Sequence, residues 1–279
     1  ASAIGPALIP MMKKEGYDAD YAVNITVTAA TTGLLIPPSH NMIIYAIAAG
    51  GGISIASLFL AGIVPGLLLG GALMAVAYLV AVKRGYPAGT FPGWRIILRS
   101  FFNVLPGMFS TLIILGGILS GVFTATESSA IAVIYTVLIA TLVYRSLSWE
   151  GFVQAAVNAS KTTALVLLII GTAAAFGWML AVTEVPLKLS TTLLEISSNP
   201  LVILLLINIM LLLLGTFMDM SPLIIITTPI LLPVVEDMGM DPVQFGIMLI
   251  LNLGMGLVTP PVGSVLFVGC AIGGIRIED

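Results

Sequence analysis

Long stretches of apolar residues without a single charge limit what this chain can fold into. They include Leu58–Val82, Ser128–Tyr144, Thr162–Val182 and Leu201–Gly215. A helix that crosses the hydrocarbon core of a membrane needs about 20 apolar residues, and only helices or closed barrels satisfy all their backbone hydrogen bonds in lipid. Because none of the stretches alternates between polar and apolar residues as a strand does, the sequence predicts an all-α, multi-pass membrane protein.

The composition agrees with this fold class and argues against several functions. Of the 279 residues, 59% are hydrophobic and 8% are charged, whereas a soluble domain carries about 25% charged residues. The net charge of −3 gives no reason to expect a nucleic-acid partner. Cys270 and His40 are the only residues of their kinds, so we expect neither a disulfide framework nor a metal centre built from these side chains.

No catalytic arrangement emerges from the motifs. The sequence contains no Gly-x-Ser-x-Gly, no Gly-Lys-Ser/Thr phosphate loop and no His-Glu-x-x-His. We therefore predict that the protein is not an enzyme and not an ATP-driven pump. Transport by such a chain would draw its energy from an ion gradient.

An internal repeat is the second strong constraint. Adding 223 to the numbers of residues 1–51 places them on residues 224–274 without a gap. The matching residues are mostly proline and glycine, which dictate backbone shape. The matched pairs are Pro6 and Pro229, Pro10 and Pro233, Gly16 and Gly239, Asp18 and Asp241, Gly33 and Gly256, Leu34 and Leu257, Pro37-Pro38 and Pro260-Pro261, and Gly50-Gly51 and Gly273-Gly274.

The charges of the two copies indicate opposite orientations in the membrane. Lys13-Lys14 in the first copy correspond to Glu236-Asp237 in the second. Since Lys and Arg favour the cytoplasmic side, the two loops are expected on opposite sides. When the predicted spans are followed in order, Lys83-Arg84 and Arg145 return to the side of Lys13-Lys14. Inverted repeats of this kind are typical of secondary transporters.

The repeat divides the chain into three predicted parts. Residues 1–57 form the first copy, with a hairpin arm and a broken helix, and residues 201–279 form the second copy, with a re-entrant hairpin and a broken helix. Residues 58–200 form scaffold and connecting helices, including an interfacial helix at Trp149–Lys161. Because a helix precedes the matched part of the second copy, we expect a corresponding hairpin arm to precede Ala1 in the full protein.

Two double prolines interrupt apolar spans at equivalent positions. Pro37-Pro38 lies within Gly33–Asn41, and Pro260-Pro261 lies within Gly256–Ser264. Proline has no amide hydrogen and keeps the residue before it out of helical geometry. Carbonyl groups one turn earlier therefore lose their partners, which is costly in lipid unless something binds them.

These breaks have two interpretations. Na⁺ takes carbonyl and hydroxyl oxygens from broken helices in transporters, and the hydroxyls of Ser39, Thr259 and Ser264 are further candidate ligands. The alternative is an ordinary proline kink whose carbonyls are satisfied by a neighbouring helix. The presence of a break in both copies favours the ion site.

A polar turn predicts a re-entrant hairpin in the second copy. Leu201–Leu214 has about 14 residues, or roughly 21 Å, which is too short for a hydrocarbon core of about 30 Å. The turn Gly215–Pro222 and an equally short run, Leu223–Val235, follow. One helix end at the tip favours cations and the other favours anions. Asp219 either orders the tip, binds a cation or caps the following helix.

Two further residues have both structural and functional interpretations. Thr124 and Glu127 have the spacing of a capping box, so we predict a structural role for Glu127. His40 either gates or contacts substrate, or makes a structural hydrogen bond.

Several motifs resemble those of a known transporter family, the large (M) subunits of tripartite ATP-independent periplasmic (TRAP) transporters. The resemblance covers essentially the whole chain. One departure is Ala125, where the family usually has proline. The similar segments are Ala3–Pro6, Ile9–Met12, Gly16–Asp18, Leu35–Ser39, Ser57–Gly66, Phe123–Glu127 and Thr259–Gly263.

This resemblance implies an elevator-type, Na⁺-driven symporter for organic acids in the bacterial inner membrane. Two or more Na⁺ ions would be co-transported. The implied partners, besides the lipid bilayer, are a small membrane (Q) subunit and a periplasmic substrate-binding protein (P subunit). Substrates of the family include C4-dicarboxylates and sialic acid, and the stretch Ser39–Tyr45 favours the sialic-acid branch.

The resemblance also implies where the ligands bind. One Na⁺ site would combine the Gly33–Ser39 break with a hairpin tip upstream of Ala1, and the other would combine Gly215–Ser221 with Gly256–Gly263. The substrate carboxylate would lie between the tips. The predicted ion-site residues are Gly33, Ile36, Pro37, Ser39, Gly215, Thr216, Asp219, Met220, Gly256, Thr259, Pro260 and Gly263. The predicted substrate residues are Pro38, His40, Asn41, Ser221, Pro261 and Ser264.

Other function classes remain as alternatives. An ion channel can also use broken helices and carbonyl sites, but inverted hairpins suit alternating access better than a pore. A Na⁺/carboxylate symporter of another family, a membrane enzyme and a passive assembly subunit are the others. Saturable, Na⁺-dependent uptake would distinguish a carrier from a channel.

Overall fold

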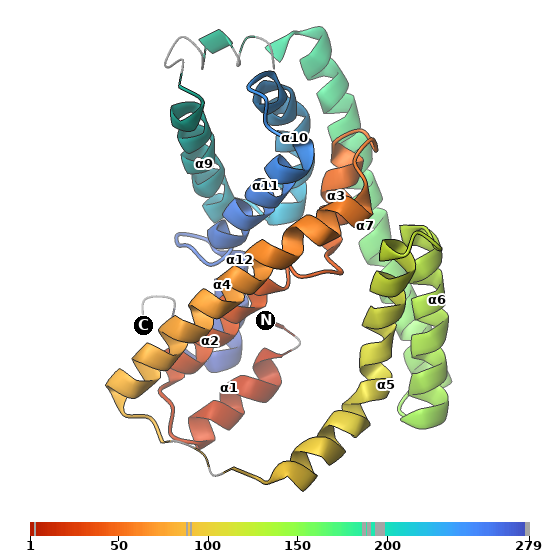
Figure 1. The fold of residues 1–279 in the computed structure, drawn as a ribbon, viewed down its shortest axis with the longest axis vertical. Coiled ribbons are helices and arrows are strands. Elements are labelled where there is room, and N and C mark those ends of the chain that lie inside the picture. The colour runs from red at the N-terminus through yellow and green to blue at the C-terminus, as the bar shows by residue number, and fades with distance from the viewer. Residues whose placement is uncertain are drawn as a thin grey trace. The chain divides into compact units, whose positions relative to one another are not determined.

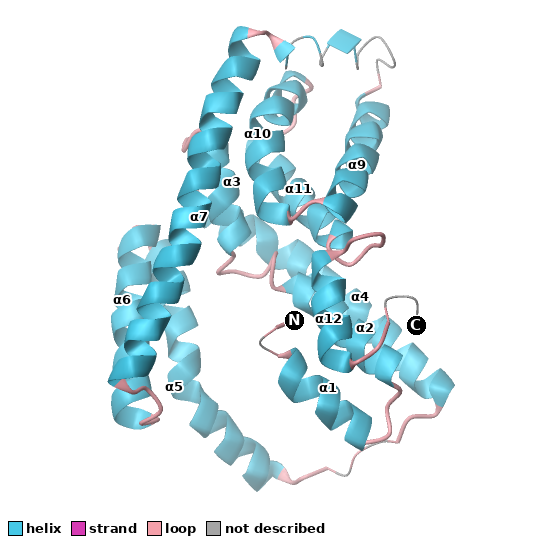
Figure 2. Ribbon diagram, turned by 180° about the vertical axis from the view of Figure 1, so that it is seen from behind, coloured by secondary structure: helices cyan, strands magenta, loops and turns pink. Residues whose placement is uncertain are grey.

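The computed structural model describes residues 1–2, 4–87, 89, 91–185, 188, 191–192 and 199–276. Every regular element in these residues is a helix (Figures 1 and 2), and six of the helices are long and apolar enough to cross a membrane. The predicted fold class, an all-α multi-pass membrane protein, is confirmed. The helices are α1 (Gly5–Lys14), α2 (Ala19–Thr32), α3 (His40–Ala48), α4 (Ile55–Arg84), α5 (Trp94–Leu119), α6 (Ala125–Leu138), the π-helical turn η1 (Ile139–Val143), α7 (Trp149–Val182), α9 (Pro200–Phe217), α10 (Met220–Asp237), α11 (Pro242–Gly256) and α12 (Ser264–Gly273).

The chain forms two compact units. One consists of Ala1–Pro87 and Ile169–Asp279, and the other consists of Ala88–Leu168. The first holds both copies of the repeat together with α4 and α9, and we call it the repeat unit. The second holds α5, α6, η1 and the first part of α7, and we call it the connecting unit.

The two copies in the repeat unit have matching elements that run in opposite directions. α2 begins at Ala19 and α11 begins at Pro242, which are equivalent residues in the repeat. In Figure 1, α2 and α3 lead upward, whereas α11 and α12 lead downward. The same opposition holds for α1 and α10. This is the arrangement that an inverted repeat predicts.

Backbone details at the joints repeat as well. Gly16 follows α1 and Gly239 follows α10, with φ angles of 90° and 83°, a conformation that glycine adopts without steric cost. The Pro37-Pro38 and Pro260-Pro261 peptide bonds are both cis. Each double proline separates two helices, α2 from α3 and α11 from α12.

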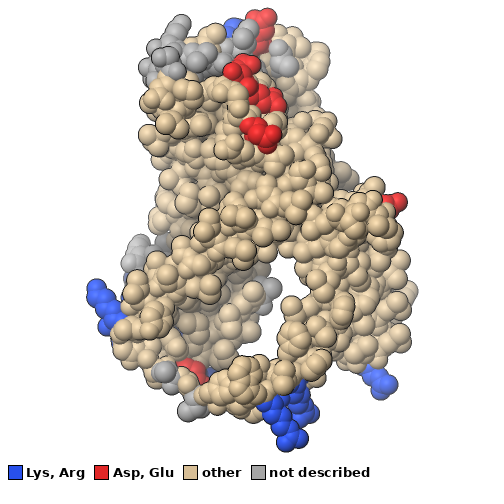
Figure 3. Space-filling view, viewed as in Figure 1, with Lys and Arg blue, Asp and Glu red and all other residues tan. Residues whose placement is uncertain are grey.

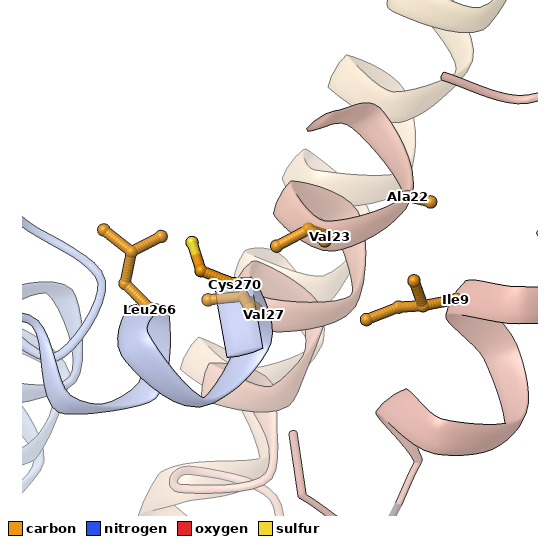
Figure 4. Packing of buried hydrophobic residues seen from close by; sticks show 6 residues of the cluster. All are labelled: Ile9, Ala22, Val23, Val27, Leu266 and Cys270. Carbon is orange, nitrogen blue, oxygen red and sulfur yellow. The ribbon is translucent and has the colours of Figure 1, made fainter. Parts of the chain in front are cut away.

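Each broken helix packs its second half on the other copy. α3 contacts α10 and α11, and α12 contacts α1 and α2. Figure 4 shows the second of these contacts as an apolar cluster. A Cβ atom on Gly269 or Gly273 would collide with Val27 or Val23 of α2, so small residues allow the close approach, as is usual between membrane helices. The cluster consists of Ile9, Ala22, Val23, Val27, Leu266 and Cys270.

A polar cluster ties the end of α4 to the start of α2. Nη1 of Arg84 lies 3.1 Å from Oδ2 of Asp18 and 2.9 Å from Oδ2 of Asp20. The Tyr86 hydroxyl donates a hydrogen bond of 2.7 Å to Asp18. α4 also packs against α2, α3 and α11, so this long helix belongs to the same compact unit as both copies of the repeat.

The hairpin α9–α10 has longer arms and a tighter turn than predicted. α9 continues to Phe217 and α10 begins at Met220, so the predicted turn Gly215–Pro222 was too long. Pro222 does not delay α10, because the first turn of a helix needs no amide donor from its own residues. Each arm has 18 residues, or about 27 Å. The predicted arm length of about 14 residues was therefore wrong.

In the connecting unit, α6 begins at the predicted capping box. The Glu127 carboxylate accepts a hydrogen bond of 2.8 Å from the Thr124 amide, and the Thr124 hydroxyl accepts one of 3.3 Å from the Glu127 amide. The structural role predicted for Glu127 is confirmed. α5 packs against α6, and the Tyr135 hydroxyl donates to the Pro106 carbonyl at 2.9 Å.

One long helix replaces two predicted segments. The predicted interfacial helix Trp149–Lys161 and the predicted span Thr162–Val182 are continuous in α7. Its 34 residues correspond to about 51 Å. The position of the first segment in the membrane interface stays a prediction.

Uncharged side chains cover most of the visible surface, as expected for a protein in lipid. In Figure 3, lysine, arginine, aspartate and glutamate occur in a few small groups separated by long uncharged stretches. On α4, Leu67, Leu68 and Met74 are 63%, 69% and 71% exposed. Such apolar exposure is stable where hydrocarbon replaces water.

Candidate ion and substrate site

Within the described residues, each proline break contains a run of carbonyl groups that accept no hydrogen bond. The carbonyls one turn before the prolines, which the sequence predicted to lose their partners, are mostly satisfied: Leu34, Gly256 and Leu257 all accept hydrogen bonds. The open carbonyls lie instead at the prolines themselves, where the chain is not helical. Oxygen atoms of this kind are the ligands that a hard cation takes from broken membrane helices. They belong to Ile36, Pro37 and Pro38 in the first copy and to the equivalent Thr259, Pro260 and Pro261 in the second.

In each break, an equivalent carbonyl, that of Leu34 or Leu257, accepts a hydrogen bond from a residue beyond the prolines. The Ser39 hydroxyl donates to the Leu34 carbonyl at 2.5 Å, and the Val265 amide donates to the Leu257 carbonyl at 3.3 Å. Beside the second break, the Thr259 hydroxyl donates to Met255 at 2.7 Å. A hydroxyl that donates its proton still has lone pairs, so Thr259 can also offer its oxygen to a cation.

The end of α9 holds the second break in place. The Thr216 carbonyl accepts hydrogen bonds from the amides of Val262 at 3.2 Å and Gly263 at 3.3 Å, which satisfies a carbonyl that the helix end leaves open. A Cβ atom on Gly256 would lie 2.7 to 2.9 Å from the backbone of Gly215. The backbones of α9 and α11 therefore touch, and only glycine fits at Gly256.

Both helices that follow the breaks reach neighbouring residues of the hairpin turn. The Ser264 hydroxyl at the start of α12 donates to Asp219 at 3.3 Å. The Asn41 amide near the start of α3 donates to the Met220 sulfur at 3.3 Å. Asp219 precedes α10, but its carboxylate accepts no backbone amide there. Among the interpretations of Asp219, the geometry favours ordering of the tip over helix capping.

Three helix N-termini converge on this turn, those of α3, α10 and α12. Each helix N-terminus carries roughly half a positive charge and unpaired amide donors, and it attracts carboxylates. Asp219 already places one negative charge here. A second anion would be repelled by it unless a cation were bound nearby.

A cavity of about 310 Å³ lies beside the first break. Its lining includes Leu34, Leu257 and Ser264. In the repeat, Ser264 corresponds to Asn41 of the first copy, which lies against Met220 at the hairpin tip of the second copy. The cavity thus corresponds to the space that the hairpin tip occupies in the second copy, and the expected first hairpin tip stays a prediction.

Comparison with known proteins decides the family. The whole chain, residues 1–279, matches the family described as the tripartite ATP-independent periplasmic transporter, DctM component. The chain belongs to this family. The predicted resemblance is confirmed, and with the six candidate spans the DctM-family chain is a multi-pass protein of the bacterial inner membrane.

Relatives of this DctM-family chain include proteins with and without a named substrate. It is 44% identical to an uncharacterized protein, YgiK of Salmonella typhimurium, over 100% of the chain and 63% of that protein. It is 40% identical to the sialic acid TRAP transporter large permease SiaM of Vibrio cholerae and 39% identical to the C4-dicarboxylate TRAP transporter large permease DctM of Pseudomonas aeruginosa, each over 99% of the chain and 64% of the relative. The chain thus spans less than two thirds of these relatives, and those with a named function are permeases rather than enzymes.

The structure leaves two predicted substrate residues outside the contacts at the turn. His40 is exposed as the first residue of α3, and Ser221 lies in the first turn of α10. Neither side chain makes a hydrogen bond within the described residues. The sites predicted for Na⁺ and substrate in this DctM-family chain stay predictions.

One polar pair between α9 and α11, Asn208 and the buried Asn252, was not among the residues predicted from the sequence. The Asn252 amide donates to both the backbone and the side-chain oxygen of Asn208, at 2.9 and 2.8 Å. Asn252 is 4% exposed, and its own Oδ1 has no hydrogen-bond partner within the described residues. An unpaired buried acceptor costs about 1–3 kcal/mol. Each asparagine is the only polar residue within its apolar run, a signal visible in the sequence.

Proposed function

We propose that this chain is the ion- and substrate-binding part of a Na⁺-coupled secondary transporter that imports a small organic acid. One observation carries the proposal. Two equivalent breaks hold carbonyls that accept no hydrogen bond from the described part of the chain, and both breaks lead into helices that start at a single hairpin turn. Carbonyl oxygens suit Na⁺, and helix N-termini suit a carboxylate.

Charge balance explains why the two ligands would depend on each other. An organic acid at the turn would add negative charge next to Asp219, so its binding would be weak alone. Na⁺ bound at the Thr259–Pro261 carbonyls would offset that charge. Mutual dependence of this kind is the thermodynamic basis of coupling.

We further propose an elevator-type movement in which the repeat unit moves as one body. The two copies pack on each other through α3 and α12, so neither copy can shift alone. Arg84 and Tyr86 fasten α4 to Asp18, and we therefore place α4 with the moving body. This differs from the sequence-based assignment of residues 58–200 to the scaffold.

The proposed partners follow from the family. Its description as tripartite supports a complex with a small membrane (Q) subunit and a periplasmic substrate-binding protein (P subunit). The binding protein would deliver the acid to the membrane part. The proposed substrate is sialic acid or a C4-dicarboxylate, and the Ser39–Tyr45 stretch makes sialic acid the first choice.

The decisive experiment is uptake by the complete transporter in proteoliposomes. We expect saturable uptake of labelled sialic acid or succinate that requires Na⁺ outside and the binding protein, with no uptake when K⁺ replaces Na⁺. Uptake that neither saturates nor depends on Na⁺ would support the channel instead. Equal uptake in Na⁺ and K⁺ would overturn the coupling.

A matched pair of variants tests the second ion site. Thr259→Val removes a hydroxyl oxygen next to the free carbonyls and should raise the half-saturating Na⁺ concentration about tenfold, the equivalent of roughly 1.4 kcal/mol. Thr28→Val removes a hydroxyl with the same bond to the preceding turn, 2.7 Å to Asn24, and should change nothing. Unchanged Na⁺ dependence in Thr259→Val would refute the site.

A further inference from the structure

We propose that the Asn208–Asn252 pair is a positioning element that sets the Na⁺ affinity of the second ion site. The two asparagines fix the register of α9 against α11, and that register places the break that carries the free carbonyls. The inference rests on the proposed function, since it names residues that tune one of its two ion sites.

The geometry of the pair suits a role in fixing the register of α9 against α11. The side-chain nitrogen of Asn252 donates to two oxygens of one residue, the backbone and side-chain oxygens of Asn208. Asn208 in turn donates to the Leu204 carbonyl at 2.8 Å and to the Met248 sulfur at 3.3 Å. A slide of α9 along α11 by one residue would break these bonds together.

The Asn208–Asn252 pair affects the ion site through the positions of α9 and α11. Gly256 lies one turn beyond Asn252 on α11, and Gly215 lies two turns beyond Asn208 on α9, where the two backbones touch. The next residue, Thr216, holds the amides of Val262 and Gly263. The break residues Thr259–Pro261 lie between these anchors, so the position of α9 sets the spacing of their carbonyls. Among the hydrogen bonds of the described residues, none joins either asparagine to these carbonyls.

A purely stabilising role explains the pair poorly. The buried Oδ1 of Asn252 has no hydrogen-bond partner among the residues that the structure describes. Two apolar side chains would pack there without the cost of that unpaired acceptor. The first copy has Ala29 at the position equivalent to Asn252. The pair is therefore a feature of one copy, and its effect should be confined to one ion site.

The test uses the complete transporter with the variants Asn252→Leu, Asn208→Leu and the double variant. Two quantities are measured: uptake rate against Na⁺ concentration, and the rise in melting temperature when NaCl replaces KCl at equal ionic strength. We expect each variant to raise the half-saturating Na⁺ concentration about three- to tenfold, the range of one or two hydrogen bonds between membrane helices. The double variant should match the single variants, because both remove the same interaction.

Controls separate positioning from simple loss of fold. Asn24→Leu makes the same change at an exposed position of α2 and should leave Na⁺ dependence unchanged. Asn252→Gln keeps the amide and should recover part of the lost affinity. The proposal would be overturned if the variants lowered the maximal rate or the amount of folded protein but left the half-saturating Na⁺ concentration constant.

The melting measurement distinguishes failure of this inference from failure of the proposed function. If the unmodified protein gains no stability from Na⁺ over K⁺, the ion coupling itself is wrong. If it gains stability and the asparagine variants gain it at the same Na⁺ concentrations, only the positioning role is wrong.

Discussion

Glycines in the repeat unit differ in what a side chain at their position would meet. Gly62 of α4 faces the Leu35 carbonyl and Met42 so closely that a Cβ atom would overlap both. Gly71 lies two and a half turns further along the same helix and has no atom within 4 Å of that position. The first glycine is required by a contact, and the second is not.

Alanine substitutions should expose this difference. Gly62→Ala should destabilise the protein by about 1–3 kcal/mol, since the Leu35 backbone must move. Gly71→Ala should be neutral or should stabilise the protein by up to about 1 kcal/mol, because alanine favours the helix more than glycine does. Thermal unfolding of the two variants in detergent checks the prediction, and equal melting temperatures would contradict the close packing of α4 on the first break.

At the scale of residues, the sequence predicted where the chain breaks better than it predicted which side chains contact each other. Each proline break could be located because proline acts on its own backbone. The contacts Ser264–Asp219 and Asn41–Met220 join residues 45 and 179 positions apart, and no local pattern encodes them. They depend on the cross-packing of the copies, which places the starts of α3 and α12 at one turn.

At the scale of elements, equivalent aspartates precede α2 and α11 but make different contacts. The Asp241 carboxylate caps α11 by accepting hydrogen bonds from the amides of Val243 at 2.8 Å and Gln244 at 3.2 Å. Asp18 makes no such bond and instead contacts Arg84 and Tyr86. The repeat conserves the residue type here but not its partners.

Substitution of the two aspartates should give different signatures. Asp241→Ala should cost about 1 kcal/mol through loss of the cap, and most of this cost should persist at high salt because the two backbone hydrogen bonds are lost at any ionic strength. Asp18→Ala removes an exposed ion pair, so its smaller effect should shrink further at high ionic strength. Melting temperatures in low and high KCl check both, and an Asp241→Ala effect that disappears at high salt would contradict its assignment as a cap.

Acid should loosen the Asp18 contacts in a predictable pH range. The Tyr86 hydroxyl, together with Arg84, holds the pKa of Asp18 below its ordinary value of 3.8. The stabilising contribution of Asp18 is thus complete above that value and is lost as the pH falls through the lowered pKa. Tyr86→Phe removes the largest cause of the shift, so the acid-dependent loss should be smaller and should be complete at a higher pH. Melting temperatures between about pH 3 and 7 test this, and identical acid profiles would refute it.

The element boundaries show why periodic patterns misplace helix ends. The turn Gly215–Pro222 looked long because it collects polar residues and a proline. Both residues nevertheless belong to helices. Thr216 lies in the last turn of α9, where its hydroxyl donates to the Leu213 carbonyl at 2.7 Å, and Pro222 lies in the first turn of α10. Similarly, the sequence changes from polar to apolar near Lys161, where two separate segments were predicted, but the helical backbone of α7 continues through this point. The capping box at Thr124 and Glu127 was predictable because its partners are local.

At the scale of the whole molecule, the inverted repeat was predictable and the exchange of half-helices was not. Proline and glycine positions revealed the repeat. The packing of α12 on α2 depends on the shapes of Gly269, Val23 and Val27, which meet only in the folded protein. Cys270 lies in that contact and is 6% exposed.

The single thiol therefore reports whether the two copies are assembled. In the native protein, Cys270 should react with a maleimide at least tenfold more slowly than after denaturation, because reactivity requires access to the thiolate. A Cys270→Ala/Ser57→Cys variant, whose thiol is exposed, should react fast in both states. Rapid labelling of native Cys270 would contradict the packing of α12 on α2.

The exchange of half-helices also has a consequence for biosynthesis. α3 is complete once the ribosome has passed residue 48, but its partner α10 begins only at Met220. At 5–20 residues per second, on the order of ten seconds or more separates the two. During that time the newly inserted first copy must keep its broken helix in the membrane without the surface it will finally contact. Nascent chains stopped before residue 220 should therefore be the stage at which insertion factors or proteases can act on this protein.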